Sequence, residues 1–113
     1  MGSSEDVYLY IIEKLSVVGT FTYKKMFGEY GVYHKEKLVG LICDNTLFIK
    51  FTPEGLSFCG DRVELAPPYE GAKPSFVISQ LHLEDLSWLR ELIQITHTAL
   101  PHVKRKKRVT ELS

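Results

Sequence analysis

The stretch Tyr23-Lys-Lys-Met-Phe-Gly-Glu-Tyr-Gly-Val-Tyr33 holds two glycines and four aromatic residues in eleven positions. Gly28 and Gly31 are interpreted as turn residues, because glycine adopts backbone conformations that would strain a side chain. The large side chains are interpreted as filling a junction between a preceding helix and a following sheet. They are Met26, Phe27, Tyr30 and Tyr33. The stretch therefore predicts a backbone path and not a reaction.

The same stretch also allows a second interpretation, as a contact surface. Lys24 and Lys25 precede the glycines, and together with exposed tyrosines they would form a basic and aromatic patch. Such a patch suits a protein partner or a single nucleic-acid strand. Both interpretations stay open at this point.

An amphipathic helix is predicted before this stretch, over residues 5 to 16. Ser3 or Ser4 supplies an N-terminal cap, and Glu5 and Asp6 supply negative charge in the first turn. Apolar residues recur at spacings of three and four and form one stripe. They are Val7, Tyr8, Ile11, Ile12 and Leu15. A stripe of this kind needs a sheet to cover.

The sheet is predicted from short β-branched and aromatic runs that turn residues separate. The runs are Thr22 to Met26, Tyr30 to Tyr33, Leu38 to Cys43 and Thr46 to Phe51. Asp44-Asn45 suits a two-residue hairpin loop, since both residues tolerate left-handed backbone. That loop pairs Cys43 with Thr46 and carries the register back along both strands. The side chains predicted on the core face are Leu38, Ile42, Leu47, Ile49 and Phe51.

The opposite face of this hairpin is too apolar to be bathed entirely in water. It collects Val39, Leu41, Cys43, Thr46, Phe48 and Lys50. A second layer, the C-terminal segment of the chain or a second copy would cover it, because exposed apolar patches on monomers mark contact sites. The candidate partner surface therefore comprises Lys24, Lys25, Tyr30, Val39, Leu41 and Phe48. A homodimer is one expected use of it.

The remaining segments complete an α+β pattern. Residues 53–60 predict a short helical turn, residues 67–71 an irregular loop with two prolines, and Ser75 to Gln80 a further strand. Leucines at helical spacing predict a C-terminal helix from about Glu84 to Leu100, ended by Pro101. We expect an antiparallel sheet of about five strands, packed with an N-terminal and a C-terminal helix. Residues 1–103 form one domain and residues 104–113 a tail.

Charge is distributed unevenly along the 113 residues, although fourteen basic and fourteen acidic residues cancel. Five of the basic residues form the run Lys104, Arg105, Lys106, Lys107 and Arg108. Nine basic and fourteen acidic residues remain elsewhere, so any affinity for nucleic acid should come from the tail, through salt-sensitive phosphate contacts. The alternative is a solvated charge run that only aids solubility. A start without basic and apolar signal regions predicts a cytoplasmic protein with no membrane segment.

Motifs for catalysis and for cofactors are not found. Gly28-Glu-Tyr-Gly31 lacks the further glycine of a dinucleotide fingerprint, and no phosphate loop is present. The histidines at 34, 82, 97 and 102 lack a paired metal-ligand spacing, and Pro101 separates the last two. Cys43 is expected to be a buried thiol, whereas Cys59 is expected to be the more exposed one, in a loop or short helix. We expect no enzyme, metal or cofactor, and keep a small enzyme or ligand-binding domain with an unrecognised cleft as a third alternative.

A family resemblance becomes visible when these segments are joined. Lys25-Met-Phe-Gly-Glu-Tyr-Gly-Val-Tyr33, the hairpin Leu38-Val-Gly-Leu-Ile-Cys-Asp-Asn-Thr-Leu-Phe-Ile-Lys50, Pro68-Tyr69 and the long C-terminal helix resemble the N-terminal domain of the TfoX (Sxy) family of bacterial competence regulators. The resemblance covers about residues 6 to 100. It implies a two-layer α+β fold similar to that of secretion-chaperone-like domains.

The resemblance also implies a role. Full-length members promote expression of DNA-uptake genes together with the cyclic-AMP receptor protein, and they carry a second, helical domain that the present sequence does not include. The expected function is therefore a regulatory module that contacts a protein, with the transcription machinery as one expected partner. A nucleic-acid-associated protein that uses the basic tail is the alternative.

Overall fold

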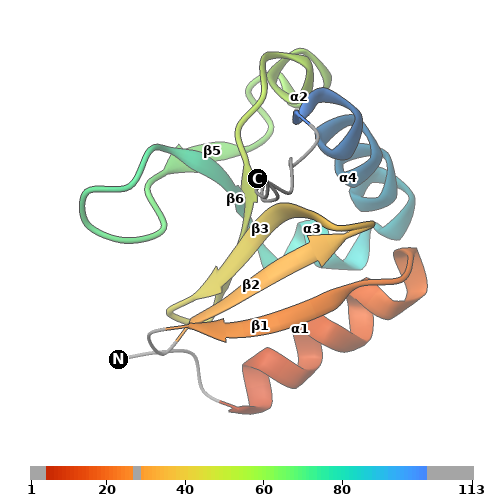
Figure 1. Ribbon diagram of the computed structural model, residues 1–113. Helices are drawn as coiled ribbons and strands as arrows, with labels where there is room; N and C mark the ends of the chain where they lie inside the picture. The colour runs from red at the N-terminus through yellow and green to blue at the C-terminus, as the bar shows by residue number, and fades with distance from the viewer. Residues whose placement is uncertain (1–4, 27–28, 102–113) are drawn as a thin grey trace, which may run out of the picture.

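The computed structural model of the protein describes residues 5–26 and 29–101. Over these ranges the chain forms an antiparallel sheet with helices packed on it (Figure 1). In chain order the elements are α1 (Glu5–Val18), β1 (Thr22–Met26), β2 (Glu29–His34), β3 (Lys37–Cys43), β4 (Thr46–Lys50), α2 (Pro53–Cys59), β5 (Glu64–Ala66), β6 (Ser75–Ile78), α3 (Gln80–Glu84) and α4 (Leu86–Ala99). The predicted α+β class is confirmed. The proposed caps of α1, Ser3 and Ser4, lie outside the described residues.

The six described strands lie in the order β1-β2-β3-β4-β6-β5, and all neighbours are antiparallel. The first four strands follow the chain order, and β6 then returns to pair with β4. The prediction of about five strands falls short by the three-residue strand β5, which lies at one edge of the sheet. The other edge is β1.

Two tight turns join the central strands. Asp44 and Asn45 have φ of 50° and 63°, which confirms the predicted two-residue hairpin loop between β3 and β4. Lys35 and Glu36 adopt the same left-handed conformation, with φ of 49° and 71°. The second turn was not predicted, because lysine and glutamate are not typical residues of left-handed turns.

The register of the β3–β4 hairpin agrees with the prediction over four pairs. Cys43 pairs with Thr46, and Gly40 pairs with Ile49. The pairing between β2 and β3 then shifts: Val32 is opposite Gly40, whereas the next residue of β2 is opposite Leu38. Val39 is therefore an extra residue, as in a β-bulge.

The bulge corrects the predicted assignment of side chains to the two faces of the sheet. Val39 was expected on the outer face, yet its side chain is fully buried in the core. Leu38, which was expected in the core, instead lines a hollow on the other side, because an extra residue reverses the alternation of side chains beyond it. Phe51 was also expected in the core; it follows the last residue of β4, where its ring packs beside that of Phe76 and the residue stays 39% exposed.

The inner face of the sheet is the one that the helices cover (Figure 1). The helix α1 contributes Ile11 and Leu15 to the core, in agreement with the predicted apolar stripe, and also Val18, which lies beyond the predicted end of the helix. The core residues that are fully shielded from solvent are Leu15, Val32, Val39, Ile42, Leu47, Ile49, Phe76, Leu89 and Leu92. Helix and sheet thus enclose one continuous apolar core.

The C-terminal helical segment is broken, whereas one helix from Glu84 was predicted. The helix α3 ends at Glu84, and α4 begins at Leu86. Between them Asp85 leaves the helical conformation, and its Oδ1 accepts a hydrogen bond from the Trp88 backbone N–H at 3.3 Å. The carboxylate caps the new helix and favours the break, because the first amides of a helix lack partners within it.

The short helix α2 confirms the predicted helical turn. Thr52 Oγ1 accepts a hydrogen bond from the Gly55 backbone N–H at 2.9 Å, and Pro53 occupies the first helical turn, where a missing N–H costs nothing. The helix packs beside α4 at the top of the molecule in Figure 1. None of the helices in the described ranges combines the length and the apolar character that crossing a membrane requires.

A candidate binding hollow on the outer face of the sheet

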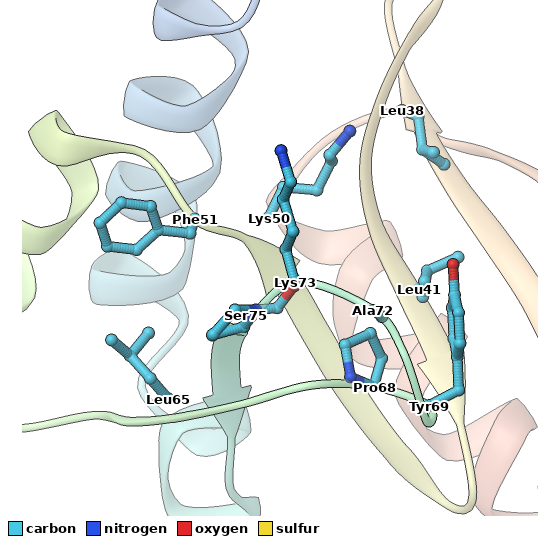
Figure 2. Close-up of a pocket in the computed structure, with 11 residues that line it drawn as sticks. Leu38, Leu41, Lys50, Phe51, Leu65, Pro68, Tyr69, Ala72, Lys73 and Ser75 are labelled. Atoms are coloured by element: carbon cyan, nitrogen blue, oxygen red, sulfur yellow. The ribbon is translucent and has the colours of Figure 1, made fainter.

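The outer face of the sheet carries a hollow of about 650 Å³. It lies between β3 and β4 on one side and the segment that joins β5 to β6 on the other (Figure 2). Its described lining residues are Leu38, Leu41, Lys50, Phe51, Leu65, Pro68, Tyr69, Ala72, Lys73, Pro74 and Ser75. The volume falls in the range of about 300 to 1,000 Å³ that is typical of ligand sites.

The floor of the hollow is apolar because of the bulge in β3. In a regular strand Leu38 and Leu41 would point to opposite faces, since they are three positions apart. The extra residue Val39 brings both leucines to the outer face, where both line the hollow. Phe51 and Leu65 extend this apolar surface and remain 39% and 41% exposed.

The wall opposite the strands is the segment 67–74, whose course is set by proline and glycine. Pro68 and Pro74 cannot donate to a strand ladder. At its tip the Ala72 N–H donates a hydrogen bond to the Tyr69 carbonyl oxygen at 3.1 Å, and Gly71 has φ of 90°. This left-handed conformation favours glycine, so the turn holds Tyr69 and Lys73 on either side of its tip.

The charged groups at the hollow are Lys50 and Lys73, and among the described lining residues there is no carboxylate. Both lysines are exposed, and neither side chain forms a hydrogen bond or ion pair with another described residue. Figure 2 shows their amino groups pointing toward the same side of the hollow, with the Tyr69 hydroxyl directed the same way. The hollow thus combines an apolar floor with uncompensated positive charge.

Comparison with known proteins identifies the family. The family TfoX N-terminal domain matches residues 13–100, which is most of the chain. The chain belongs to the TfoX N-terminal domain family. It is also 38% identical over 87 residues to an uncharacterized 12.7 kDa protein in the trpE 5′ region of Spirochaeta aurantia, covering 77% of this chain and 74% of the relative.

In this TfoX N-terminal domain the predicted apolar contact surface is divided between the two faces. Leu41 lines the outer hollow, as a contact residue would. Val39 is fully buried in the core and Phe48 is only 8% exposed, so neither offers a free side chain to a partner. The sequence missed Lys73, Leu65 and Tyr69, because their approach to β3 depends on the path of a loop without periodicity.

The predicted basic and aromatic patch is not brought together as one surface. Lys24 and Lys25 are both exposed, but they are consecutive strand residues and therefore point to opposite faces of β1. Tyr30 is packed against α1, where its ring stacks on Tyr8 with centroids 3.7 Å apart. Burial of Tyr8 raises the pKa of its hydroxyl, with a smaller contribution from Tyr30.

The motif residues of the TfoX N-terminal domain have different structural positions. Gly31 was predicted at a turn but lies inside β2, paired with Lys24 and Leu41. Tyr30 belongs to the helix–sheet junction as predicted, whereas Tyr33 is half-buried opposite Leu38, outside the packed core. The backbone of Met26 ends β1. Phe27 and Gly28 lie outside the described residues.

Neither cysteine is an exposed nucleophile. The expected exposure of Cys59 is wrong: its side chain is 2% exposed, since α2 turns it into the core. Burial raises the pKa of the Cys59 thiol, although Arg62 acts in the opposite direction. Cys43 is buried as predicted, and burial, with smaller effects from Glu29 and Asp44, raises its pKa to about 12. A thiol with a raised pKa is a poor nucleophile.

Two of the histidines, His34 and His97, pack together at the end of α4. The rings of His34 and His97 meet edge to face at 5.3 Å, and the amino group of Lys37 donates to the carbonyl oxygens of His97 and Leu100 at 2.7 and 2.8 Å. Burial, and then the charge of Lys37, lower the pKa of His97. Within residues 5–26 and 29–101 no group of three or more His, Cys, Asp or Glu residues could hold a metal ion.

The predicted nucleic-acid tail lies outside the described residues. It comprises Lys104, Arg105, Lys106, Lys107 and Arg108. The predicted separation of His97 from His102 by Pro101 also involves a residue outside the described ranges, His102.

Proposed function

We propose that this TfoX N-terminal domain is a regulatory module that binds a partner protein on the outer face of its sheet. The observation that supports the proposal is the apolar hollow there, which the helices leave open because they cover the inner face. Contiguous exposed apolar surface on a soluble domain marks an interaction site. The hollow is therefore the surface at which a partner gains most from contact.

The proposal assigns binding, and not catalysis, to this surface. Among the described lining residues the titratable side chains are Lys50, Lys73 and Tyr69. Within the part of the chain that the structure describes, none of the three is hydrogen-bonded to a side chain that could act as a general base. The hollow can thus attract charge and bury apolar groups, but it does not hold a nucleophile and base in contact.

The regulatory part of the proposal comes from family membership. The sequence resembles regulators of DNA-uptake genes, so a component of the transcription machinery in the cytoplasm is the partner class that this resemblance favours. The Spirochaeta aurantia relative is uncharacterized and adds no function.

The test uses an aspartate in the hollow and a matched aspartate elsewhere. Leu41→Asp places a charge on the apolar floor, whereas Leu81→Asp changes a leucine on α3 that is 81% exposed. Proteins captured by the wild-type chain should be retained by Leu81→Asp and lost with Leu41→Asp in quantitative mass spectrometry. Leu65→Asp provides a second variant at the hollow, should Leu41→Asp fail to fold. Equal capture by all folded variants would contradict the proposal.

Nucleic-acid binding through residues 104–108 is the alternative, which the charge of that run favours. Binding of a DNA duplex is measured at increasing salt, with the full chain and with a chain ending at residue 102. The alternative expects a steep salt dependence that disappears on truncation. That result, together with capture that is insensitive to Leu41→Asp, would replace the proposed function.

A further inference from the structure

We propose that the segment bound in the outer hollow is acidic and apolar: a large apolar side chain enters the floor, and neighbouring carboxylates meet Lys50 and Lys73. This inference rests on the proposed function and specifies the chemistry of the partner. The occupant is a short segment of another protein, and one of its side chains fills the hollow.

Charge is the first reason for this choice. Away from residues 104–108 the chain carries nine basic and fourteen acidic residues, so a surface without a carboxylate departs from its average. The hollow is such a surface, since its charged described residues are the two lysines alone. Their amino groups have no described acidic partner and point toward the same side of the hollow (Figure 2). An arriving carboxylate would thus find two cations without displacing an existing ion pair.

The apolar floor is the second reason. Leu38 and Leu41 form it from β3, and Phe51 and Leu65 flank it while remaining more than a third exposed. The volume of about 650 Å³ has room for a bulky side chain with its adjoining backbone. A ligand with charge alone would leave this surface wet, so the occupant needs an apolar group next to its carboxylates.

Charge also disfavours two other occupants. The chain's own tail carries five basic residues at 104–108, which Lys50 and Lys73 would repel. A second copy that used the same surface would bring its own Lys50 and Lys73 to the contact, with no lining carboxylate among the described residues to compensate them. An acidic segment of a different protein avoids both repulsions.

The experiment measures binding of a fluorescein-labelled nine-residue peptide that alternates leucine and glutamate around a central tryptophan. Two matched peptides replace its glutamates with glutamine, or its leucines and tryptophan with serine. Anisotropy gives the affinities, and NMR shifts of Leu41, Leu65 and Ala72 amides locate the site. We expect the acidic peptide to bind roughly tenfold more tightly than either matched peptide, with the difference from the glutamine peptide shrinking as salt rises.

Matched substitutions in the protein test the same contact between lysines and carboxylates. Lys50→Gln with Lys73→Gln should weaken the acidic peptide roughly tenfold, whereas Lys24→Gln with Lys25→Gln, which removes two exposed lysines on β1, should change it less than about twofold. Lys50→Arg with Lys73→Arg should restore binding, because it keeps the charge. Circular dichroism melting confirms that each variant is folded.

Each of the following results would overturn the inference. They include equal binding of the acidic and glutamine peptides, and no binding of the acidic peptide at millimolar concentration. Another is a titration in which laurate or an oligothymidine strand, added in place of the peptide, shifts the NMR signals of the hollow amides while the peptide does not. Dimerisation sensitive to Leu41→Asp in light scattering would likewise assign the hollow to a second copy. A captured partner that is lost with Leu41→Asp, but is insensitive to the glutamine pair, would leave the proposed function standing and reject only the acidic segment.

Discussion

The two faces of the sheet are formed by the same strands, but they differ in how completely they are shielded from solvent. The inner face is closed by α1 and α4, and neither Ile49 on its strand nor Leu89 on the covering helix has any exposed surface. On the outer face the hollow is bordered by segment 67–74, and Phe51 and Leu65, which also line it, stay more than a third exposed. A helix presents a regular apolar stripe that can seal a sheet, whereas a loop with prolines and a glycine cannot. The inner face thereby supplies the stability of the fold, and the outer face is the one to which we assign the proposed binding.

The largest effect should come from the inner face. Leu89→Ala is expected to lower the free energy of unfolding by about 2–5 kcal/mol, because it leaves a cavity among fully buried neighbours. The matched change Leu65→Ala at the hollow should cost less than about 1 kcal/mol, since Leu65 is already 41% exposed. Urea unfolding monitored by circular dichroism measures both. Equal losses would mean that the outer face is sealed as tightly as the inner one.

An intermediate loss of stability is expected at Gly40, which lies next to the bulge in β3. A Cβ atom on Gly40 would collide with the Phe48 carbonyl oxygen and lie 3.2 Å from Ile49 Cδ1. Gly40→Ala should therefore destabilise the fold by about 1–3 kcal/mol, since the backbone of β4 must shift. Gly19→Ala is the control, because its nearest contact would be an ordinary 3.4 Å to the His34 ring. An unchanged urea midpoint for Gly40→Ala would show that the strands separate easily there.

Thiol labelling of the unchanged chain involves the smallest perturbation of the fold. It samples one cysteine outside the core cluster and one within it. Cys43 lies in β3 outside the core cluster, Cys59 lies within it, and burial raises both thiol pKa values. At pH 8 iodoacetamide should label the folded chain far more slowly than the unfolded chain, because little thiolate is present. In mild urea, single Cys→Ser variants report which thiol becomes accessible first. Labelling of the folded chain at the unfolded rate would contradict the burial of that cysteine.

The fold could be predicted where local chemistry determines the geometry. Asp44-Asn45 tolerates left-handed backbone, and this alone fixes the register from Cys43 and Thr46 back to Gly40 and Ile49. The stripe Ile11, Leu15 of the first helix follows directly from helical spacing. Family membership could also be predicted, because the motif and the hairpin are continuous in sequence.

The exchange of faces at Val39 could not be predicted in the same way. A bulge depends on the pairing of β3 with β2, and a period of two in the sequence does not reveal an extra residue. The break at Asp85 was missed for a similar reason, since an aspartate is compatible with the first turn of a helix and with its cap. In both places a pairing or capping contact overrides the simple pattern.

Only some of the residues that line the hollow could be predicted from the sequence. Leu41 and Lys50 were assigned to the outer face by the hairpin register, and the structure keeps them there. Lys73 and Tyr69 come from a segment whose distance from β3 depends on two neighbouring prolines and on the turn at Gly71. Their meeting with Lys50 is a tertiary contact without a local signal.

The position of β1 gives Lys24 and Lys25 a consequence unrelated to any ligand. β1 is one edge of the sheet, and the opposite edge, β5, is only three residues long. An open edge of unpaired amides and carbonyls invites another chain to add a strand and so begin aggregation. Two adjacent exposed lysines on the longer edge, and the shortness of the other, oppose such addition at both ends of the sheet.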